Sequence, residues 1–190
     1  MADASQLPAL PRFPSSLAVD AADRRLQTRV PCGGGMPTDE FPADTARWVQ
    51  EYIEDRHDFL AWLNTTVDAI DYGRVVMTVP FDEKLTNKPP AGEVDADSLG
   101  MHGGVAATLI DTAGGVAQRT MLDDPLDGGV VTVNLNVNYL RRASGNLTAT
   151  ADVVRAGGSI GVSTVTVESP TPEGGTEAVA TGQAAYRLFR

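Results

Sequence analysis

Residues 103–121 carry apolar side chains at helical spacing, and this segment limits the possible folds more than any other part of the chain. The predicted helix has one apolar face, formed by Val105, Leu109, Thr112, Ala113 and Val116. Its opposite face has almost no side-chain bulk and consists of Gly104, Ala107, Thr108, Asp111, Gly114 and Gly115. Glycine in a helix interior costs about 1 kcal/mol relative to alanine. We therefore expect another group to approach the backbone of this face closely.

Strand-like segments precede and follow this helix. Their residue patterns predict a hairpin over 66–70 and 74–80 and further strands over 130–140, 146–155, 159–168 and 177–189. The strand over 130–140 alternates strictly, with Val131, Val133, Leu135, Val137 and Tyr139 on one side and Thr132, Asn134, Asn136 and Asn138 on the other. We expect the last four strands to form an antiparallel meander.

Residues 43–63 have a second helical pattern. Its apolar positions are Val49, Tyr52, Ile53, Leu60 and Leu63, and Phe59 and Trp62 widen the stripe. One long helix packed against a curved antiparallel sheet is the economical arrangement for this order of elements. We therefore predict an α+β fold.

The chain of 190 residues divides near residue 38. Residues 1–37 contain five prolines and the run Gly33-Gly34-Gly35, without sustained helical or strand periodicity. We expect a flexible arm over 1–37, followed by a single domain over 38–190. The arm is either a genuine tail or precedes a true start at Met36. It contains no apolar stretch typical of a secretory signal, so we expect a cytoplasmic protein.

The charge composition excludes several classes of partner. The formal net charge is −10, which argues against binding to nucleic acid or to an anionic membrane surface. A single cysteine, Cys32, excludes an internal disulfide framework and a Cys-based zinc site, and the presence of only two histidines argues against a His-rich site, so we predict no metal. Basic residues are 13 arginines and two lysines, while 17 of the 25 acids are aspartate. This bias indicates either adaptation to high salt or a GC-rich genome.

The residues at the start of the predicted central helix resemble a known signature. His102-Gly103-Gly104, followed by Leu109, Asp111 and Gly114, resembles the H-G-G-x(4)-L-x-D-x-x-G signature of hotdog-fold acyl-CoA thioesterases, particularly the phenylacetyl-CoA thioesterase-like (PaaI-like) branch. The resemblance covers roughly residues 59–189. It implies a hotdog fold, in which a curved antiparallel sheet wraps a long central helix, and hydrolysis of an acyl-CoA without a further cofactor.

The same residues suggest a mechanism on chemical grounds alone. Free N–H groups of Gly103 and Gly104, at a helix N-terminus, can form an oxyanion hole for a thioester carbonyl. His102 either orients this carbonyl or has only a packing role. Asp111 acts as a general base on water or attacks the carbonyl itself, unless it is merely a structural or surface carboxylate.

Gly103 and Asp111 are too far apart to serve one carbonyl within one chain. Eight residues separate them, which is about 12 Å along a helix at ~1.5 Å per residue. Two antiparallel copies of the helix would bring Asp111 of one chain opposite Gly103 of the other. We therefore predict a homodimer or homotetramer with composite sites, an arrangement that the family resemblance also implies.

The resemblance assigns roles to further residues. Thr132 lies where relatives often have a Ser or Thr that positions the attacking water. Asn87 corresponds to a polar residue that orients the carbonyl or the water, although an insertion separates it from His102. The remaining candidates for substrate binding are Gly104, Arg155, Gly157, Gly158 and Arg141, of which the turn over 155–158 meets the CoA phosphates in relatives. Thr132 and Arg141 are also interpretable as an ordinary strand residue and an exposed strand-end charge.

Two other functions are compatible with the hotdog fold. A non-catalytic acyl-CoA-binding or sensing module would not need Asp111 in this position. A hotdog hydratase or dehydratase typically has Asp and His in a D-x-N-x-x-H-like arrangement, and this spacing is absent here. Acyl-CoA thioester hydrolysis is therefore the favoured hypothesis.

Overall fold

The computed structural model describes residues 44–88, 99–122, 128–172 and 174–189, so the arm predicted over 1–37 lies outside the described residues. The elements, in chain order, are α2 (Thr45–Arg56), α3 (Asp58–Trp62), β1 (Thr66–Asp71), β2 (Arg74–Val79), the short 3-10 helix η3 (Glu83–Leu85), α4 (Gly103–Arg119), β3 (Gly129–Tyr139), β4 (Leu147–Ala156), β5 (Ile160–Pro170) and β6 (Thr176–Phe189). None of the helices in these ranges is long and apolar enough to cross a membrane.

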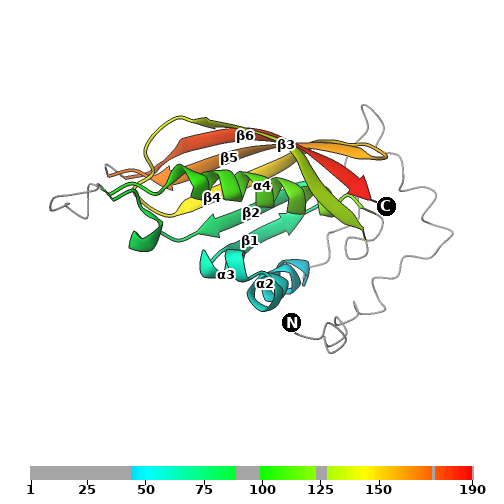
Figure 1. The fold of residues 1–190 in the computed structure, drawn as a ribbon, viewed down its shortest axis with the longest axis horizontal. Helices are drawn as coiled ribbons and strands as arrows, with labels where there is room; N and C mark the ends of the chain where they lie inside the picture. Colours follow the sequence, from blue (N-terminus) through cyan, green and yellow to red (C-terminus); the bar gives the residue numbers. More distant parts are fainter. Residues whose placement is uncertain (1–43, 89–98, 123–127, 173, 190) are drawn as a thin grey trace, which may run out of the picture. The chain divides into compact units, whose positions relative to one another are not determined.

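The six strands form one antiparallel sheet around the central helix. The strand order is β1-β2-β4-β5-β6-β3. Helix α4 lies against one face of this sheet, and α2 lies beside β1 (Figure 1). The fully buried side chains of Leu109 and Ile110 in α4 share the core with Met77 in β2 and Val165 in β5. The predicted α+β fold, with a long helix against a curved antiparallel sheet, is confirmed.

The predicted four-strand meander is wrong at its first strand. β3 pairs with β6, whereas β4 pairs with β2 and so joins the first hairpin to the rest of the sheet. Alternation of polar and apolar residues specifies which face of a strand is buried, but not which strand lies beside it. As a result, β3 is an edge strand, and the hairpin β1–β2 belongs to the same sheet.

β3 does not keep the strict alternation predicted for residues 130–140. Thr132 pairs with Tyr186 and Asn134 with Ala185, so Val133 is the extra residue of a β-bulge. A bulge reverses the faces of the residues that follow it. Thr132 consequently lies on the same side as Tyr139, toward α4, and not on the opposite side as predicted.

The helix predicted over 43–63 is interrupted at His57. This residue has φ −126° and ψ 69°, outside the helical region, and separates α2 from α3. Ile53 and Leu60 are buried, but Phe59 and Trp62 are 54% and 53% exposed. The change of direction at His57 therefore removes both aromatic side chains from the apolar stripe that the sequence predicted.

The two faces of α4 also differ from the prediction. Gly114 is buried, while Thr112 and Val116 are only half-buried. The phenol of Tyr186 occupies the space beside Gly114, where an added Cβ would lie 2.2 Å from the Tyr186 Oη. The expected close approach to the glycine face is therefore made, at Gly114, by a side chain of β6.

Candidate active site

The N-terminus of α4 is capped by a histidine. His102 is the N-cap residue, and its Nδ1 accepts a hydrogen bond of 2.9 Å from the N–H of Gly104. This bond occupies one of the two N–H groups predicted to be free. The N–H of Gly103 has no hydrogen-bond partner within the described residues. Because Nδ1 is an acceptor here, a neutral His102 carries its proton on Nε2.

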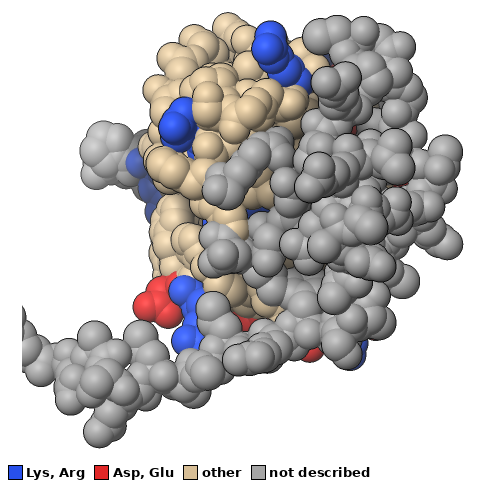
Figure 2. Space-filling model, turned by 90° about the vertical axis from the view of Figure 1, so that its right-hand side faces the viewer, with Lys and Arg blue, Asp and Glu red and all other residues tan. Residues whose placement is uncertain are grey.

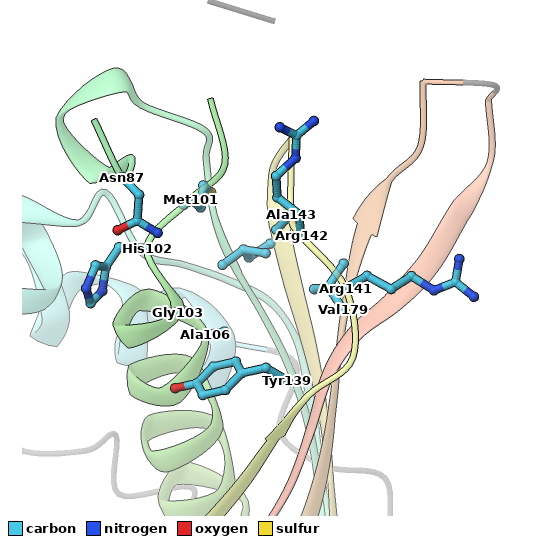
Figure 3. A pocket seen from close by; sticks show the side chains of 11 residues that line it. Asn87, Met101, His102, Gly103, Ala106, Tyr139, Arg141, Arg142, Ala143 and Val179 are labelled. Carbon is cyan, nitrogen blue, oxygen red and sulfur yellow. The ribbon is translucent and has the colours of Figure 1, made fainter. Parts of the chain in front are cut away.

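Asn87 lies close to this N-terminus despite its distance in the sequence. The N–H of His102 donates to the carbonyl of Leu85 at 2.7 Å, and the N–H of Asn87 donates to the carbonyl of Gly100 at 3.0 Å. These bonds join the segments on either side of residues 89–98, which lie outside the described residues. Figure 3 shows the Asn87 amide pointing toward His102. The long predicted insertion thus does not prevent their approach.

A cavity of about 210 Å³ lies beside the start of α4. Asn87, His102 and Gly103 form its polar part (Figure 3). The apolar lining consists of Met101, Ala106, Ala143, Leu147 and Val179. This combination can accept an apolar group while a polar atom of the same molecule lies near Gly103.

Tyr139 forms a wall of this cavity next to Gly103. A Cβ added to Gly103 would lie 3.0 Å from Cε1 of the Tyr139 ring, which is closer than ordinary van der Waals contact. Glycine therefore lets the ring pack against the first residue of α4. Tyr139 is the last residue of β3 and is 58% exposed, so it lies at the mouth of the cavity.

Asp111 and Thr132 form a second polar group farther along α4. The hydroxyl of Thr132 donates to Asp111 Oδ1 at 2.6 Å. Asp111 projects from the middle of α4, and Thr132 reaches it because the bulge at Val133 begins directly after it. The structure therefore brings together these two residues, which the sequence separates by 21 positions.

Tyr186 contacts the backbone of this pair from the sheet side. Its side chain is only 1% exposed, and its hydroxyl donates to the backbone carbonyl of Asp111 at 3.0 Å. Burial, and secondarily the negative charge of Asp111, raise the pKa of Tyr186 above its ordinary value. The phenol is therefore a neutral hydrogen-bond donor at neutral pH.

The two polar groups are separate within one chain. Asn87, His102 and Gly103 line the cavity, but Asp111 and Thr132 do not. The rise of α4 accounts for this separation, because eight residues of helix span about 12 Å. Each chain thus has the Gly103 N–H, which has no partner among the described residues, at the start of α4 and the Asp111 carboxylate near its middle.

The predicted substrate-binding residues fall at different ends of the fold. Arg141 and Arg142 line the cavity, but both guanidinium groups point away from Gly103 (Figure 3), and Arg141 is paired with Glu177. Arg155 lies near the other end of α4, where its carbonyl accepts a hydrogen bond from Gln118. The charged side chains visible in Figure 2 are scattered over a mostly uncharged described surface.

Gly157 and Gly158 form the hairpin turn after Arg155. The N–H of Gly157 donates to the carbonyl of Ile160 at 2.9 Å, and a Cβ on Gly157 would lie 2.7 Å from that oxygen. Gly158 is exposed and has open space around its Cα. The turn thus sterically requires glycine at position 157. At position 158 a side chain would meet no neighbouring atom, and glycine there leaves the backbone of the turn accessible.

No sequence pattern indicates that Tyr139, Tyr186 or the apolar residues of the cavity lie at the site. Tyr139 was assigned only to a strand, although it directly precedes the Leu140-Arg141 segment. For Tyr186, the available signal was the unexplained Gly114, which requires a partner of large volume. Within the described ranges, no group of three His, Cys, Asp or Glu side chains is arranged to hold a metal ion.

Comparison with known proteins identifies the family. Residues 100–176 match the profile of the thioesterase superfamily. A candidate esterase from Halobacterium salinarum is 44% identical over 149 residues, which cover 77% of this chain and 94% of the relative. Among solved structures, a thioesterase family protein from Silicibacter pomeroyi is 26% identical with a TM-score of 0.62, covering 77% of this chain and 97% of its own.

A more distant structure shows the same fold. Thioesterase HI1161 from Haemophilus influenzae is 20% identical and has a TM-score of 0.61, over 76% of this chain and 90% of its own. Its likeness extends to the antiparallel sheet and the central helix that carry the candidate site. The chain therefore belongs to the thioesterase superfamily and has the hotdog fold.

Proposed function

We propose that this thioesterase-superfamily enzyme hydrolyses an acyl- or aryl-acyl-CoA to the free acid and CoA. The observation that carries the proposal is the arrangement along α4. Gly103, whose N–H has no partner within the described residues, lines a largely apolar cavity, and eight residues later Asp111 accepts a hydrogen bond from Thr132. These are a donor for the developing oxyanion and a carboxylate for activating water.

In the proposed reaction, the thioester carbonyl oxygen accepts a hydrogen bond from Gly103, with Asn87 and His102 orienting the substrate. Asp111 removes a proton from water, the water oxygen attacks the carbonyl carbon, and the CoA thiolate leaves and is protonated. Direct attack by Asp111 gives the same products through an anhydride that water then cleaves. In either case, Thr132 keeps the carboxylate oriented.

The active unit in this proposal is a homodimer, or a homotetramer built from two such dimers. The edge strand β3 supports this assembly. It is eleven residues long, and its outer backbone groups have no neighbouring strand within the described sheet. Val131, Val133 and Tyr139 on this strand are 55%, 56% and 58% exposed. A second chain against β3 would cover these side chains and set Asp111 opposite the partner's half of the site.

We assign the CoA part of the substrate to the surface outside the cavity in the dimer, and not within one chain, since Arg155 lies at the other end of α4. Arg155 and the open turn at Gly158 offer an exposed guanidinium and accessible backbone for phosphate groups. Arg141 is a second candidate, and it would have to exchange its pairing with Glu177 for the nucleotide. Gly115, one turn after Asp111, supports the PaaI-like subtype, since other subtypes carry Ser or Thr there.

A substrate panel tests the proposed activity. Acetyl-, medium-chain, long-chain and aryl-acyl-CoA are incubated at high salt, as the acidic composition suggests, and thiol release is followed spectrophotometrically. Hydrolysis of at least one member supports the proposal. Hydration of an enoyl-CoA without thiol release would assign the hydratase activity instead, and binding without turnover would assign a sensing module.

Filling the cavity should shorten the preferred acyl chain. Ala143 is 8% exposed and lines the cavity, so the Ala143→Leu variant adds three carbon atoms to the proposed acyl site. We expect kcat/KM to fall at least about tenfold for the longest accepted acyl-CoA. Acetyl-CoA is the internal control and should be hydrolysed as by the parent enzyme. An equal loss across the whole series would show that the cavity does not hold the acyl chain.

A further inference from the structure

We propose that Tyr186 is a positioning residue that holds Thr132 and Asp111 in register for the reaction. The inference rests on the proposed function, because it concerns how the proposed carboxylate is aligned. Tyr186 does not line the cavity, and its side chain is buried, so it acts through the two residues that it contacts and not through the substrate.

Tyr186 contacts both members of the pair by independent connections. Its backbone lies directly opposite Thr132 in the β3–β6 ladder. Its side chain crosses to α4, where the hydroxyl donates to the Asp111 carbonyl at 3.0 Å. A single residue thus links the strand that carries the hydroxyl donor to the helix turn that carries the carboxylate.

The bulge in β3 makes this link critical for the direction of Thr132. The ladder shifts register immediately after the Thr132–Tyr186 pair, since Asn134 is opposite Ala185. Thr132 is therefore the last residue before the irregularity, and the pairing with Tyr186 determines the face on which its hydroxyl lies. The result is the 2.6 Å bond from Thr132 to Asp111 Oδ1.

The helix is shaped to receive this phenol. Gly114 lies three residues after Asp111, and any side chain there would overlap the Tyr186 hydroxyl, at 2.2 Å from an added Cβ. The neighbouring Gly115 also lies near the ring, with an added Cβ 3.4 Å from Cε1. Gly114 thus allows the phenol to reach the Asp111 carbonyl from the sheet side, whereas a Cβ at Gly115 would make only an ordinary contact with the ring.

A second buried bond provides a control on the same helix. Ser163 is fully buried in β5, and its hydroxyl donates to the carbonyl of Gly114 at 3.1 Å. Like the Tyr186 bond, it joins a sheet hydroxyl to a backbone carbonyl of α4. It contacts neither Asp111 nor Thr132, so its loss should weaken the packing of the helix without changing the pair.

The test measures kcat, KM and Tm for Tyr186→Phe, Ser163→Ala, Thr132→Val and the double variant Tyr186→Phe/Thr132→Val. Tyr186→Phe keeps the ring and removes only the hydroxyl. We expect kcat to fall about tenfold, with KM within twofold of the parent value. Both single variants should have a lower Tm than the parent, Ser163→Ala at least as much as Tyr186→Phe because Ser163 Oγ also accepts a hydrogen bond from Gln118 at 2.9 Å. Ser163→Ala should nevertheless leave kcat unchanged. In the double variant, kcat should equal that of Thr132→Val, because the pair is already broken.

Besides an unchanged kcat in Tyr186→Phe, two results would overturn the proposal. One is an equal fall in kcat for Tyr186→Phe and Ser163→Ala, which would indicate a general packing effect. The other is full multiplication of the two losses in the double variant, which would show that Tyr186 does not act through Thr132. If Tyr186→Phe does not fold, Gly114→Ala replaces it, because the added Cβ displaces the hydroxyl while retaining the tyrosine.

Failure of this inference is distinguishable from failure of the proposed function. If Asp111→Asn abolishes turnover but Tyr186→Phe has the parent kcat, only the role of Tyr186 is refuted. If Asp111→Asn retains the parent kcat, the proposed use of the carboxylate is itself wrong.

Discussion

Replacing Asp111 by asparagine should lower kcat at least about 100-fold, the scale on which a general acid or base contributes. Asparagine has nearly the same shape as aspartate, and its side-chain oxygen can still accept the hydrogen bond from Thr132 Oγ1. It cannot remove a proton from water or attack a carbonyl. The variant should therefore retain the parent's Tm and oligomeric mass, and thiol release from the preferred acyl-CoA measures the loss.

Asp152→Asn is the matched control, because it removes the same charge elsewhere. Asp152 lies in β4, is half-exposed and pairs with Arg74, with no contact to the candidate site. Its kcat should equal that of the parent protein. Turnover by Asp111→Asn near the parent level would remove Asp111 from the mechanism, and an equal loss in both variants would point to a charge effect.

Mixing two inactive variants should restore about a quarter of the parent activity if the site is composite. The first variant is Asp111→Asn, which lacks the carboxylate. The second is Gly103→Pro, which lacks the N–H proposed to bind the oxyanion. In a mixed dimer, one site combines the intact Gly103 of the first chain with the intact Asp111 of the second, while the other site carries both lesions. Random reassortment makes half of the dimers mixed, each with one good site of two.

The backbone at the start of α4 is suited to this experiment. Proline is accepted at the first position of a helix, and it requires an extended residue before it. His102 has φ −62° and ψ 132°, which meets that requirement. Gly103→Ala is the control, because it adds a similar contact with Tyr139 but keeps the N–H, so it should retain far more activity than the proline variant.

The mixed sample is prepared by unfolding and refolding the two variants together, and native mass spectrometry confirms the mixed dimer. Absence of restored activity in confirmed mixed dimers would mean that Gly103 and Asp111 do not serve one carbonyl from different chains. If the Gly103→Pro variant by itself has activity comparable to that of the parent protein, this N–H is excluded as the oxyanion donor.

Local patterns in the sequence predicted the elements well. The helix expected over 103–121 is observed as Gly103–Arg119, and the strand expected over 177–189 as Thr176–Phe189. Periodicity succeeds here because burial of one face is a local property of a helix or strand. The interruption at His57 was missed, since the apolar stripe continues across it and only the backbone angles end the helix.

The candidate site was predictable where the signal was a residue type at a fixed spacing. His102 and Gly103 stand at the start of the predicted helix in an H-G-G signature, and Asp111 is the single acid within it. The approach of Asn87 to His102 depends on backbone bonds between the segments around residues 85–87 and 100–102. Such bonds form between segments that are distant in sequence, and neither segment shows a pattern that specifies the other.

The sequence by itself determined the helices and strands of the α+β fold, the long central helix and the position of its single acid, because each depends on residues within one or two turns. The capping of this helix by His102 was not among these features, since the Gly104 N–H was expected to be free. Only the tertiary structure decided that β3 lies beside β6, that a bulge at Val133 turns Thr132 toward Asp111, and that Tyr186 fills the space left by Gly114. These features depend on contacts between residues 21 to 75 positions apart in the sequence. Their energies arise only when the sheet has closed around the helix, so no local pattern could indicate them.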